Sequence, residues 1–445
     1  MTAKQKGATI SFIVVTACFA LWGFANDVTN PMVKAFSKIF KMSVTDGALV
    51  QTAFYGGYFV LALPAALFIR RYSYKSGILV GLLLFAVGSF AFYPASLSGN
   101  YYPFLVAYFI LTCGLSFLET SANPYILTLG DKEHAAMRIN LAQSFNPIGS
   151  LCGMFVAMYF IQERLSPLSA AQRQLLSNAD FEAVKNADLA VLSSPYIVLG
   201  IVVIALAAVI FFLPMHSREQ SKPPEQSNLN LRATFRRILQ SHKYLWGFVA
   251  QFFYVGAQIM CWTFIIQYGT EIFSRNGMTE IDAETTSQRY NIVAMIFFCS
   301  FRFICTFLMR YIAATRLLAT FATIATVLTI GVILSDGISG MYCLIGISAC
   351  MSLMFPTIYS IALSELDIED AKIGAAGQIM AILGGSLLPP LQALIIDQGT
   401  VGMLPAVNVS FVVLMVSFVV VAYFALRTMA VDKAQITDSQ KHGRK

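Results

Sequence analysis

The chain contains twelve apolar stretches, each long enough to cross a bilayer as a helix. A hydrocarbon core about 30 Å thick needs about 20 apolar residues per helix, and lipid offers no hydrogen-bond partner to the peptide groups of an open, irregular segment. Charged residues make up only 12% of the 445 residues, where soluble domains average about 25%. We therefore predict an all-α polytopic membrane protein with 12 transmembrane helices, and not a soluble enzyme or a nucleic-acid-binding protein.

The twelve stretches form two groups of six, separated by the most polar interval of the chain. We predict an N-terminal six-helix bundle over residues 1–214, a cytoplasmic linker over 215–244, a C-terminal six-helix bundle over 245–430 and a cytoplasmic tail over 431–445. Two six-helix bundles favour a transporter whose halves move about a site near the bilayer midplane. The eight cysteines lie in apolar stretches without metal-type spacing, so we expect no metal and no cofactor.

The distribution of basic residues predicts the orientation. With both termini in the cytoplasm, 21 of the 30 lysines and arginines lie in cytoplasmic segments and 8 in external segments, and Arg302 lies within a span. The positive-inside rule favours this arrangement, which predicts a multi-pass protein of the bacterial cytoplasmic (inner) membrane. We expect a monomer in the lipid bilayer. We expect the external segment 163–194 to be a solvated surface segment that covers the helix ends. For Arg302 we expect a structural or snorkelling role.

Two carboxylates interrupt the predicted spans. An ionised acid at membrane depth costs several kcal/mol unless it is paired, hydrated or protonated, so Asp27 and Glu119 are candidates for proton coupling. Asn26 and Asn30 lie on the helix of Asp27, and Asn123 follows Glu119 by four residues. Residues three or four apart share one face of a helix, so each acid can act together with amides.

Further polar residues recur on two other predicted helices. Gln143 and Asn146 are three residues apart, and Gln251, Gln258 and Trp262 follow one stripe of the seventh span. Carboxylates, amides and an indole supply the donors, acceptors and flat apolar face that bind a monosaccharide. The alternative is that these amides only join helices by hydrogen bonds.

Several of these residues stand in segments that resemble one transporter family. The segments are Leu21–Asn26 (LWGFAN), Gln51–Phe59 (QTAFYGGYF), Tyr72–Gly77 (YSYKSG), Leu118–Pro124 (LETSANP), Asn140–Asn146 (NLAQSFN) and Ala250–Gln258 (AQFFYVGAQ). Together they resemble the fucose permease type of sugar:proton symporter in the major facilitator superfamily.

The resemblance implies the major facilitator fold and the symport of L-fucose, or a closely related hexose, with a proton by alternating access. Glu119 matches the acid that the family carries on its fourth helix, and Gln143 and Asn146 match amides on the fifth helix. Tyr55, in the second motif, completes the expected substrate contacts. The family pattern Asn-x-x-Asp on the first helix reads Asp27-x-x-Asn30 here.

This exchange leaves other functions open. A sodium- or proton-coupled symporter for glucose, galactose or an N-acetyl hexosamine is the nearest alternative, because the cluster at residues 26–30 offers oxygen ligands to a hard cation. A membrane sugar sensor would need a larger output module than the tail. The four histidines lie outside the predicted spans, so we do not expect an enzyme embedded in the membrane.

Overall fold

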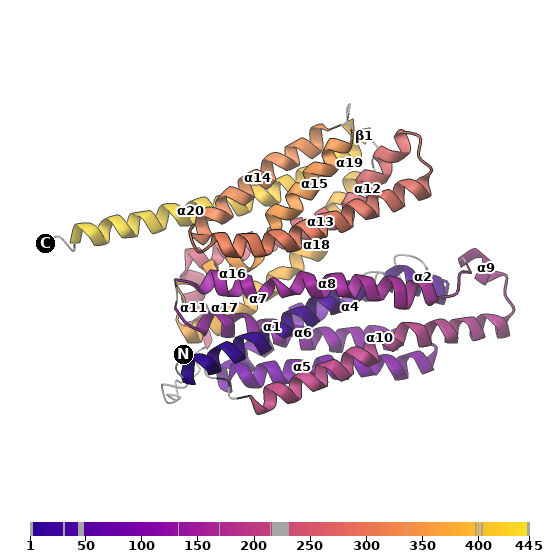
Figure 1. Cartoon of the computed structure of the whole chain (residues 1–445), viewed down its shortest axis with the longest axis horizontal. Helices are drawn as coiled ribbons and strands as arrows, with labels where there is room; N and C mark the ends of the chain where they lie inside the picture. Colours follow the sequence, from indigo (N-terminus) through magenta and orange to yellow (C-terminus); the bar gives the residue numbers. More distant parts are fainter. Residues whose placement is uncertain are drawn as a thin grey trace. The chain divides into compact units, whose positions relative to one another are not determined.

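In the part of the chain that the computed structural model describes, most residues form helices and two short strands pair in a ladder (Figure 1). The structure describes residues 3–29, 32–42, 49–131, 133–168, 170–213, 215, 231–335, 337–396, 398, 400–401 and 404–442. Predictions that fall on other residues, among them Asn30 and residues 216–230 of the linker, lie outside the described residues.

The helices of the first half of the chain are α1 (Ala3–Thr29), α2 (Met32–Phe40), α4 (Leu49–Arg71), α5 (Tyr74–Ser98), α6 (Tyr102–Thr128), α7 (Ala135–Gln143), α8 (Phe145–Val156), η1 (Ala157–Ile161), η2 (Gln162–Arg164), α9 (Ala170–Gln174) and α10 (Asn178–Phe212). The second half continues with α11 (Leu231–Gln240), α12 (His242–Arg275), α13 (Glu280–Leu308), α14 (Ala314–Leu334), α15 (Ile338–Met351), α16 (Met354–Leu363), α17 (Ile368–Met380), η4 (Ala381–Leu383), α18 (Gly384–Ile396), α19 (Ala406–Ser410) and α20 (Val412–His442). The strands β1 (Thr400–Val401) and β2 (Leu404–Pro405) pair antiparallel.

Twelve helical segments among the described residues are long and apolar enough to cross a membrane, which confirms the predicted number of spans. The sixth span differs most from its prediction, because α10 begins at Asn178 and not near the apolar stretch that starts at Tyr196. Ser177 caps this helix: its hydroxyl accepts a hydrogen bond from the Asp180 amide at 3.2 Å. A capped polar extension therefore precedes the apolar part of the helix.

Contacts divide the chain into two units, and each unit takes one segment from the other half of the sequence. The first unit comprises Met1–Leu129, Phe145–Ser227 and Ala375–Met380, and the second comprises Gly130–Ser144, Asn228–Gly374 and Ala381–Lys445. Helix α7 thus belongs to the second unit, where the Asn140 Nδ2 donates to the Thr357 Oγ1 at 3.1 Å. The boundary between Ser227 and Asn228 falls within the interval predicted as a linker, in which α11 also forms.

Within the first unit, glycines let helices approach backbone to backbone. A Cβ atom added at Gly149 of α8 would lie 1.8 Å from the carbonyl oxygen of Ala20 on α1, and one added at Gly114 of α6 would lie 2.4 Å from the amide nitrogen of Phe85 on α5. Small residues are the usual means of close helix packing in lipid. These contacts hold α1 close to α8 and α5 close to α6.

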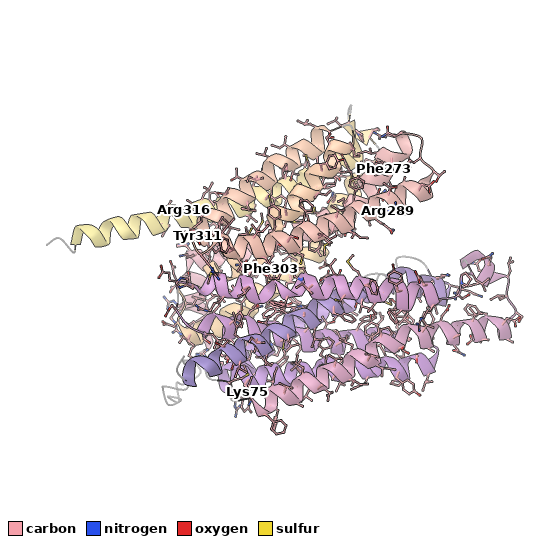
Figure 2. The ribbon with its side chains drawn as sticks, in the orientation of Figure 1. Lys75, Phe273, Arg289, Phe303, Tyr311 and Arg316 are labelled. Carbon is pink, nitrogen blue, oxygen red and sulfur yellow. The ribbon has the colours of Figure 1, made fainter. Side chains whose placement is uncertain are left out.

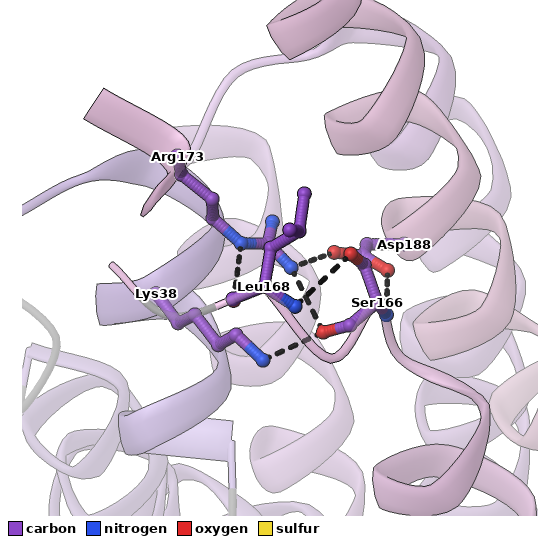
Figure 3. Close-up of polar contacts among 5 residues, drawn as sticks. All are labelled: Lys38, Ser166, Leu168, Arg173 and Asp188. Atoms are coloured by element: carbon purple, nitrogen blue, oxygen red, sulfur yellow. Dashed lines mark hydrogen bonds and ion pairs between the residues drawn. The ribbon is translucent and has the colours of Figure 1, made fainter. Parts of the chain in front are cut away.

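The segment between the fifth and sixth spans contains a buried ion pair, so the expectation of a merely solvated cover is wrong. Arg173 is 0% exposed and Asp188 is 2% exposed, and the Arg173 Nη2 lies 2.5 Å from the Asp188 Oδ2. The backbone carbonyl of Ser166 accepts hydrogen bonds from Arg173 and Lys38, as Figure 3 shows. Desolvation and the charge of Arg173 lower the pKa of Lys38, although Asp188 acts in the opposite direction. This cluster anchors the segment to α2 and α10.

Two spans are broken inside the second unit, and one arginine binds both breaks. The fifth span is interrupted at Ser144, between α7 and α8, and the tenth between α15 and α16. Arg302 on α13 is buried, and its Nε donates to the Ser352 carbonyl at 2.6 Å while its Nη1 donates to the Gln143 carbonyl at 2.9 Å. Carbonyls at the end of a helix lack intrahelical partners. Arg302 therefore has the predicted structural role, but it is buried and does not snorkel.

Basic residues also mark helix ends and loops at the molecular surface. The Lys75 ammonium donates to the carbonyls of Phe211 and Leu213, at the C-terminal end of α10, where a cation is favoured by the helix dipole. Figure 2 labels Lys75 and shows that, within the second unit, Tyr311 and Arg316 lie at the end opposite to Phe273.

We predict that Asp188→Asn strongly destabilises the protein. The substitution leaves the buried Arg173 guanidinium without its counter-charge, and breaking a buried pair in this way costs about 3–5 kcal/mol. Thermal unfolding of purified protein in detergent measures the effect. Asp180→Asn, at an exposed position of the same helix, is the control and should change stability by less than about 1 kcal/mol. Equal unfolding temperatures for the two variants would contradict the assigned role of the ion pair.

We also predict that Arg302→Gln lowers the unfolding temperature. The shorter side chain cannot reach both carbonyls, and each buried acceptor left unpaired costs about 1–3 kcal/mol. Arg316→Gln is the control, because Arg316 is exposed and surface substitutions usually change stability by less than about 0.5 kcal/mol. If Arg302→Gln unfolds at the same temperature as the control, the two carbonyls do not depend on the guanidinium.

Candidate functional site

Glu119 lies in the middle of α6, and side chains from two other helices surround it. It is 3% exposed. Tyr58 of α4 forms a side-chain hydrogen bond with the Glu119 carboxyl group, and the Trp22 indole N–H of α1 donates to the Tyr58 hydroxyl oxygen at 2.8 Å. Since the indole can only donate, the hydroxyl accepts from Trp22 and is free to donate to Glu119. A chain of hydrogen bonds thus joins α1, α4 and α6.

The Glu119 carboxyl group has no cationic partner in the described part of the chain, where neither a salt bridge nor an electrostatic contact with a base involves it. Its Oε2 atom is buried and accepts no hydrogen bond from the described residues. A charged carboxylate in such surroundings is costly, and groups of this kind in membranes commonly bind and release protons. The geometry suits a group that alternates between a protonated and a charged form.

The other predicted carboxylate, Asp27, lies within the last turn of α1. Asn26 and Asp27 are both half-buried, and Asp27 interacts electrostatically with Tyr55 of α4. Tyr55 and Tyr58 are three residues apart on α4, so they face in similar directions. Asn30, the fourth member of the predicted cluster, lies outside the described residues.

The amides predicted on the fifth span have different surroundings. The Asn146 Nδ2 of α8 donates to the Phe19 carbonyl of α1 at 3.3 Å, so this amide already joins two helices. Gln143 ends α7, has a buried side chain and accepts the hydrogen bond from Arg302 through its backbone carbonyl. In the division of the chain by residue contacts, Asn146 belongs to the first unit and Gln143 belongs to the second. The break at Ser144 separates two residues that the sequence placed on one continuous helix face.

The remaining predicted residues lie on α12, as the spacing indicated. Gln251 is 0% exposed, and neither its Oε1 nor its Nε2 has a hydrogen-bond partner among the described residues. Gln258 is half-buried. The Trp262 indole N–H donates to the Ser348 hydroxyl at 3.0 Å, and its ring meets Phe298 edge-on with centroids 4.9 Å apart. An unsatisfied buried amide is unusual in proteins and points to a ligand or an ordered water.

Trp22 and Tyr58 were not among the predicted site residues, although both stand within the motifs Leu21–Asn26 and Gln51–Phe59. A buried tyrosine hydroxyl or indole N–H usually has a hydrogen-bond partner. The presence of a tryptophan and a tyrosine in these motifs was therefore the available sequence signal for polar contacts between helices. The chain has 19 tyrosines, however, and their spacing does not indicate which hydroxyl meets an acid on another helix.

A cavity of about 590 Å³ lies in the second unit. It is lined by residues from α11, α12, α17 and α20, among them Arg237, Lys243, Glu365 and Asp370, and by none of the predicted site residues. No group of three or more His, Cys, Asp and Glu side chains that could hold a metal ion occurs among the described residues.

Comparison with known proteins identifies relatives of the whole chain. An L-fucose-proton symporter of Haemophilus influenzae is 47% identical over 97% of this chain and 100% of its own length. The crystal structure of the E. coli fucose:proton symporter is 30% identical and covers 95% of this chain and 99% of its own, with a TM-score of 0.85. A glucose/galactose transporter of Brucella abortus is 29% identical over 96% of this chain and 95% of its own length.

These relatives carry the names of transporters and not of enzymes, which agrees with the class predicted from the sequence. The resemblance to the fucose permease type of symporter is confirmed by the first two. Residues 15–387 match the family described as Major Facilitator Superfamily. The match spans most of the chain and includes α1, α6 and α12, which carry the candidate site. The chain is therefore a member of the Major Facilitator Superfamily.

Proposed function

We propose that this protein carries L-fucose, or a closely related hexose, into the cell together with a proton. The observation that carries the proposal is the buried Glu119 carboxyl group, which is hydrogen-bonded to Tyr58 and has no cationic partner among the described residues. The 47% identity to the Haemophilus influenzae L-fucose-proton symporter supports both the sugar and the proton.

In the proposed cycle, the sugar site opens to one side of the membrane at a time. Glu119 takes up a proton on the outer side, and its neutral form lowers the cost of enclosing the site away from water. Release of the proton on the inner side restores the starting state. The Tyr58 hydroxyl can form a hydrogen bond with both forms of Glu119, because it can donate to a carboxylate and accept from a carboxylic acid. Asp27 is the second carboxylate that we assign to coupling.

The driving force is sufficient for accumulation. Moving one charge through about 100 mV supplies about 2.3 kcal/mol, and 1.36 kcal/mol corresponds to a factor of ten. Symport with one proton can therefore concentrate the sugar about 50-fold before any pH gradient is added.

We assign the sugar contacts to the predicted polar residues. Gln251 supports this assignment most strongly, because it is buried with two unsatisfied amide atoms that match the donors and acceptors of sugar hydroxyls. Gln258 and the ring of Trp262 lie on the same helix. Asn26, Asn30, Tyr55, Gln143 and Asn146 complete the proposed set.

We further propose that both termini face the cytoplasm and that the protein works as a monomer in the bacterial inner membrane. The excess of lysine and arginine in the segments thereby placed inside supports this orientation.

The central test is Glu119→Gln, which keeps the shape of the side chain and its ability to accept from Tyr58 but cannot release a proton. We expect loss of uphill sugar accumulation in vesicles, with sugar-for-sugar exchange across the membrane retained, because exchange needs no net proton movement. Glu163→Gln is the control at an exposed glutamate and should retain both activities. Full uphill accumulation by Glu119→Gln would refute the coupling role.

One alternative is a symporter of the same fold that uses sodium or carries glucose or galactose. It is favoured by the order Asp27-x-x-Asn30 and by the relative that is named as a glucose/galactose transporter. Radiolabelled fucose uptake into vesicles, driven separately by a proton and a sodium gradient, distinguishes the coupling ions. We expect uptake with the proton gradient and alkalinisation of the medium. Competition by unlabelled fucose, glucose, galactose and N-acetylglucosamine ranks the sugars, and we expect fucose to compete best. Uptake that follows only sodium, or that glucose inhibits more strongly than fucose, would favour the alternative.

A further inference from the structure

Helix α11 lies outside the twelve spans and is held to the second unit by one of its faces. Thr234 and Ile238 are buried on this face. The Arg237 guanidinium forms two hydrogen bonds with the Asp370 carboxylate, from Nε to Oδ2 at 2.6 Å and from Nη2 to Oδ1 at 2.7 Å. Bidentate pairs of this kind are among the stronger and more directional polar contacts. The orientation of α11 about its own axis is therefore defined.

The part of α11 that faces away from this contact combines apolar and basic side chains. Phe235 is 38% exposed and Leu239 is 59% exposed, and they stand four residues apart. Arg232 and Arg236 are also exposed and four residues apart. At 3.6 residues per turn, the two pairs form neighbouring stripes along the helix. The helix carries no acidic residue.

The helix also lies beside the membrane in sequence. It ends at Gln240, and Ser241 caps α12, whose membrane-spanning segment begins at His242. The amphipathic pattern, the lack of acids and this position are together typical of helices that lie in the membrane interface.

We propose that α11 binds the membrane surface, with Phe235 and Leu239 in contact with lipid acyl chains and Arg232 and Arg236 in contact with the phosphates of anionic lipids. The cationic stripe complements anionic headgroups. Two exposed apolar side chains on a ten-residue helix cover far less than the roughly 1,200 Å² that a stable protein interface needs, which favours lipid over a second copy of the chain. The proposal rests on the membrane spans and is independent of the sugar and of the coupling ion.

A photo-crosslinking amino acid at position 239 tests the apolar contact. The full-length protein is reconstituted in vesicles of phosphatidylcholine with phosphatidylglycerol, irradiated and analysed by mass spectrometry. We expect a mass increase of one phospholipid. The same amino acid at Ile238, which is buried on the face that is held to the second unit, is the control and should give little lipid adduct. Crosslinked dimers, or equal lipid labelling at the two positions, would overturn the proposal.

The basic stripe is tested by the double substitution Arg232→Gln with Arg236→Gln. The ratio of phosphatidylglycerol to phosphatidylcholine retained by the purified protein, measured by native mass spectrometry, should fall by about fivefold for each arginine removed. The double substitution to lysine keeps both charges and should retain the ratio, which separates lost charge from lost folding. An unchanged ratio in the glutamine variant, in protein that still takes up sugar, would exclude the headgroup contact.

Discussion

The constraint on which the structure depends is that lipid supplies no hydrogen bonds. Each peptide group in the membrane must find a partner within the protein, and helices meet this demand except where they break. At the breaks of the fifth and tenth spans, the carbonyls of Gln143 and Ser352 are bound by Arg302. Burial within the protein imposes a similar demand on Arg173 and Asp188, which lie as a pair because either charge alone would be far more costly there.

Against this background, the polar groups that lack a protein partner are informative. Arg302 donates to two carbonyls, and Arg173 and Asp188 form an ion pair, although the Arg173 Nη1 has no hydrogen-bond partner among the described residues. One oxygen of Glu119 and the whole amide of Gln251 are not satisfied within the described residues. The satisfied groups stabilise the fold, and Glu119 and Gln251 are the groups to which we assign the proton and the sugar. The distinction supports the division between structural and transport residues proposed above.

Much of this arrangement was predictable from the sequence because hydrophobicity and membrane thickness act locally. Such local rules predict the twelve spans and the acid in the fourth span. They also predict the stripe on the seventh span, which consists of Gln251, Gln258 and Trp262. Contacts between distant residues do not. Tyr58 is separated from Trp22 by 36 residues, and the bond from Arg302 to Gln143 joins residues 159 apart. The extension of α10 to Asn178 was missed because a polar helix outside the apolar stretch leaves no hydropathy signal.

The sequence by itself determined the membrane class, the number of spans, the family resemblance and the rare acids within the spans, because each of these follows from composition, period or motif along one segment. Only the tertiary structure decided which polar groups are neutralised. It paired Arg173 with Asp188, directed Arg302 to two helix breaks and engaged Asn146 with the first helix. It left Glu119 with a tyrosine and, among the described residues, no cation. The physical reason is that the cost of a buried charge is set by its neighbours in space, and those neighbours come from other helices.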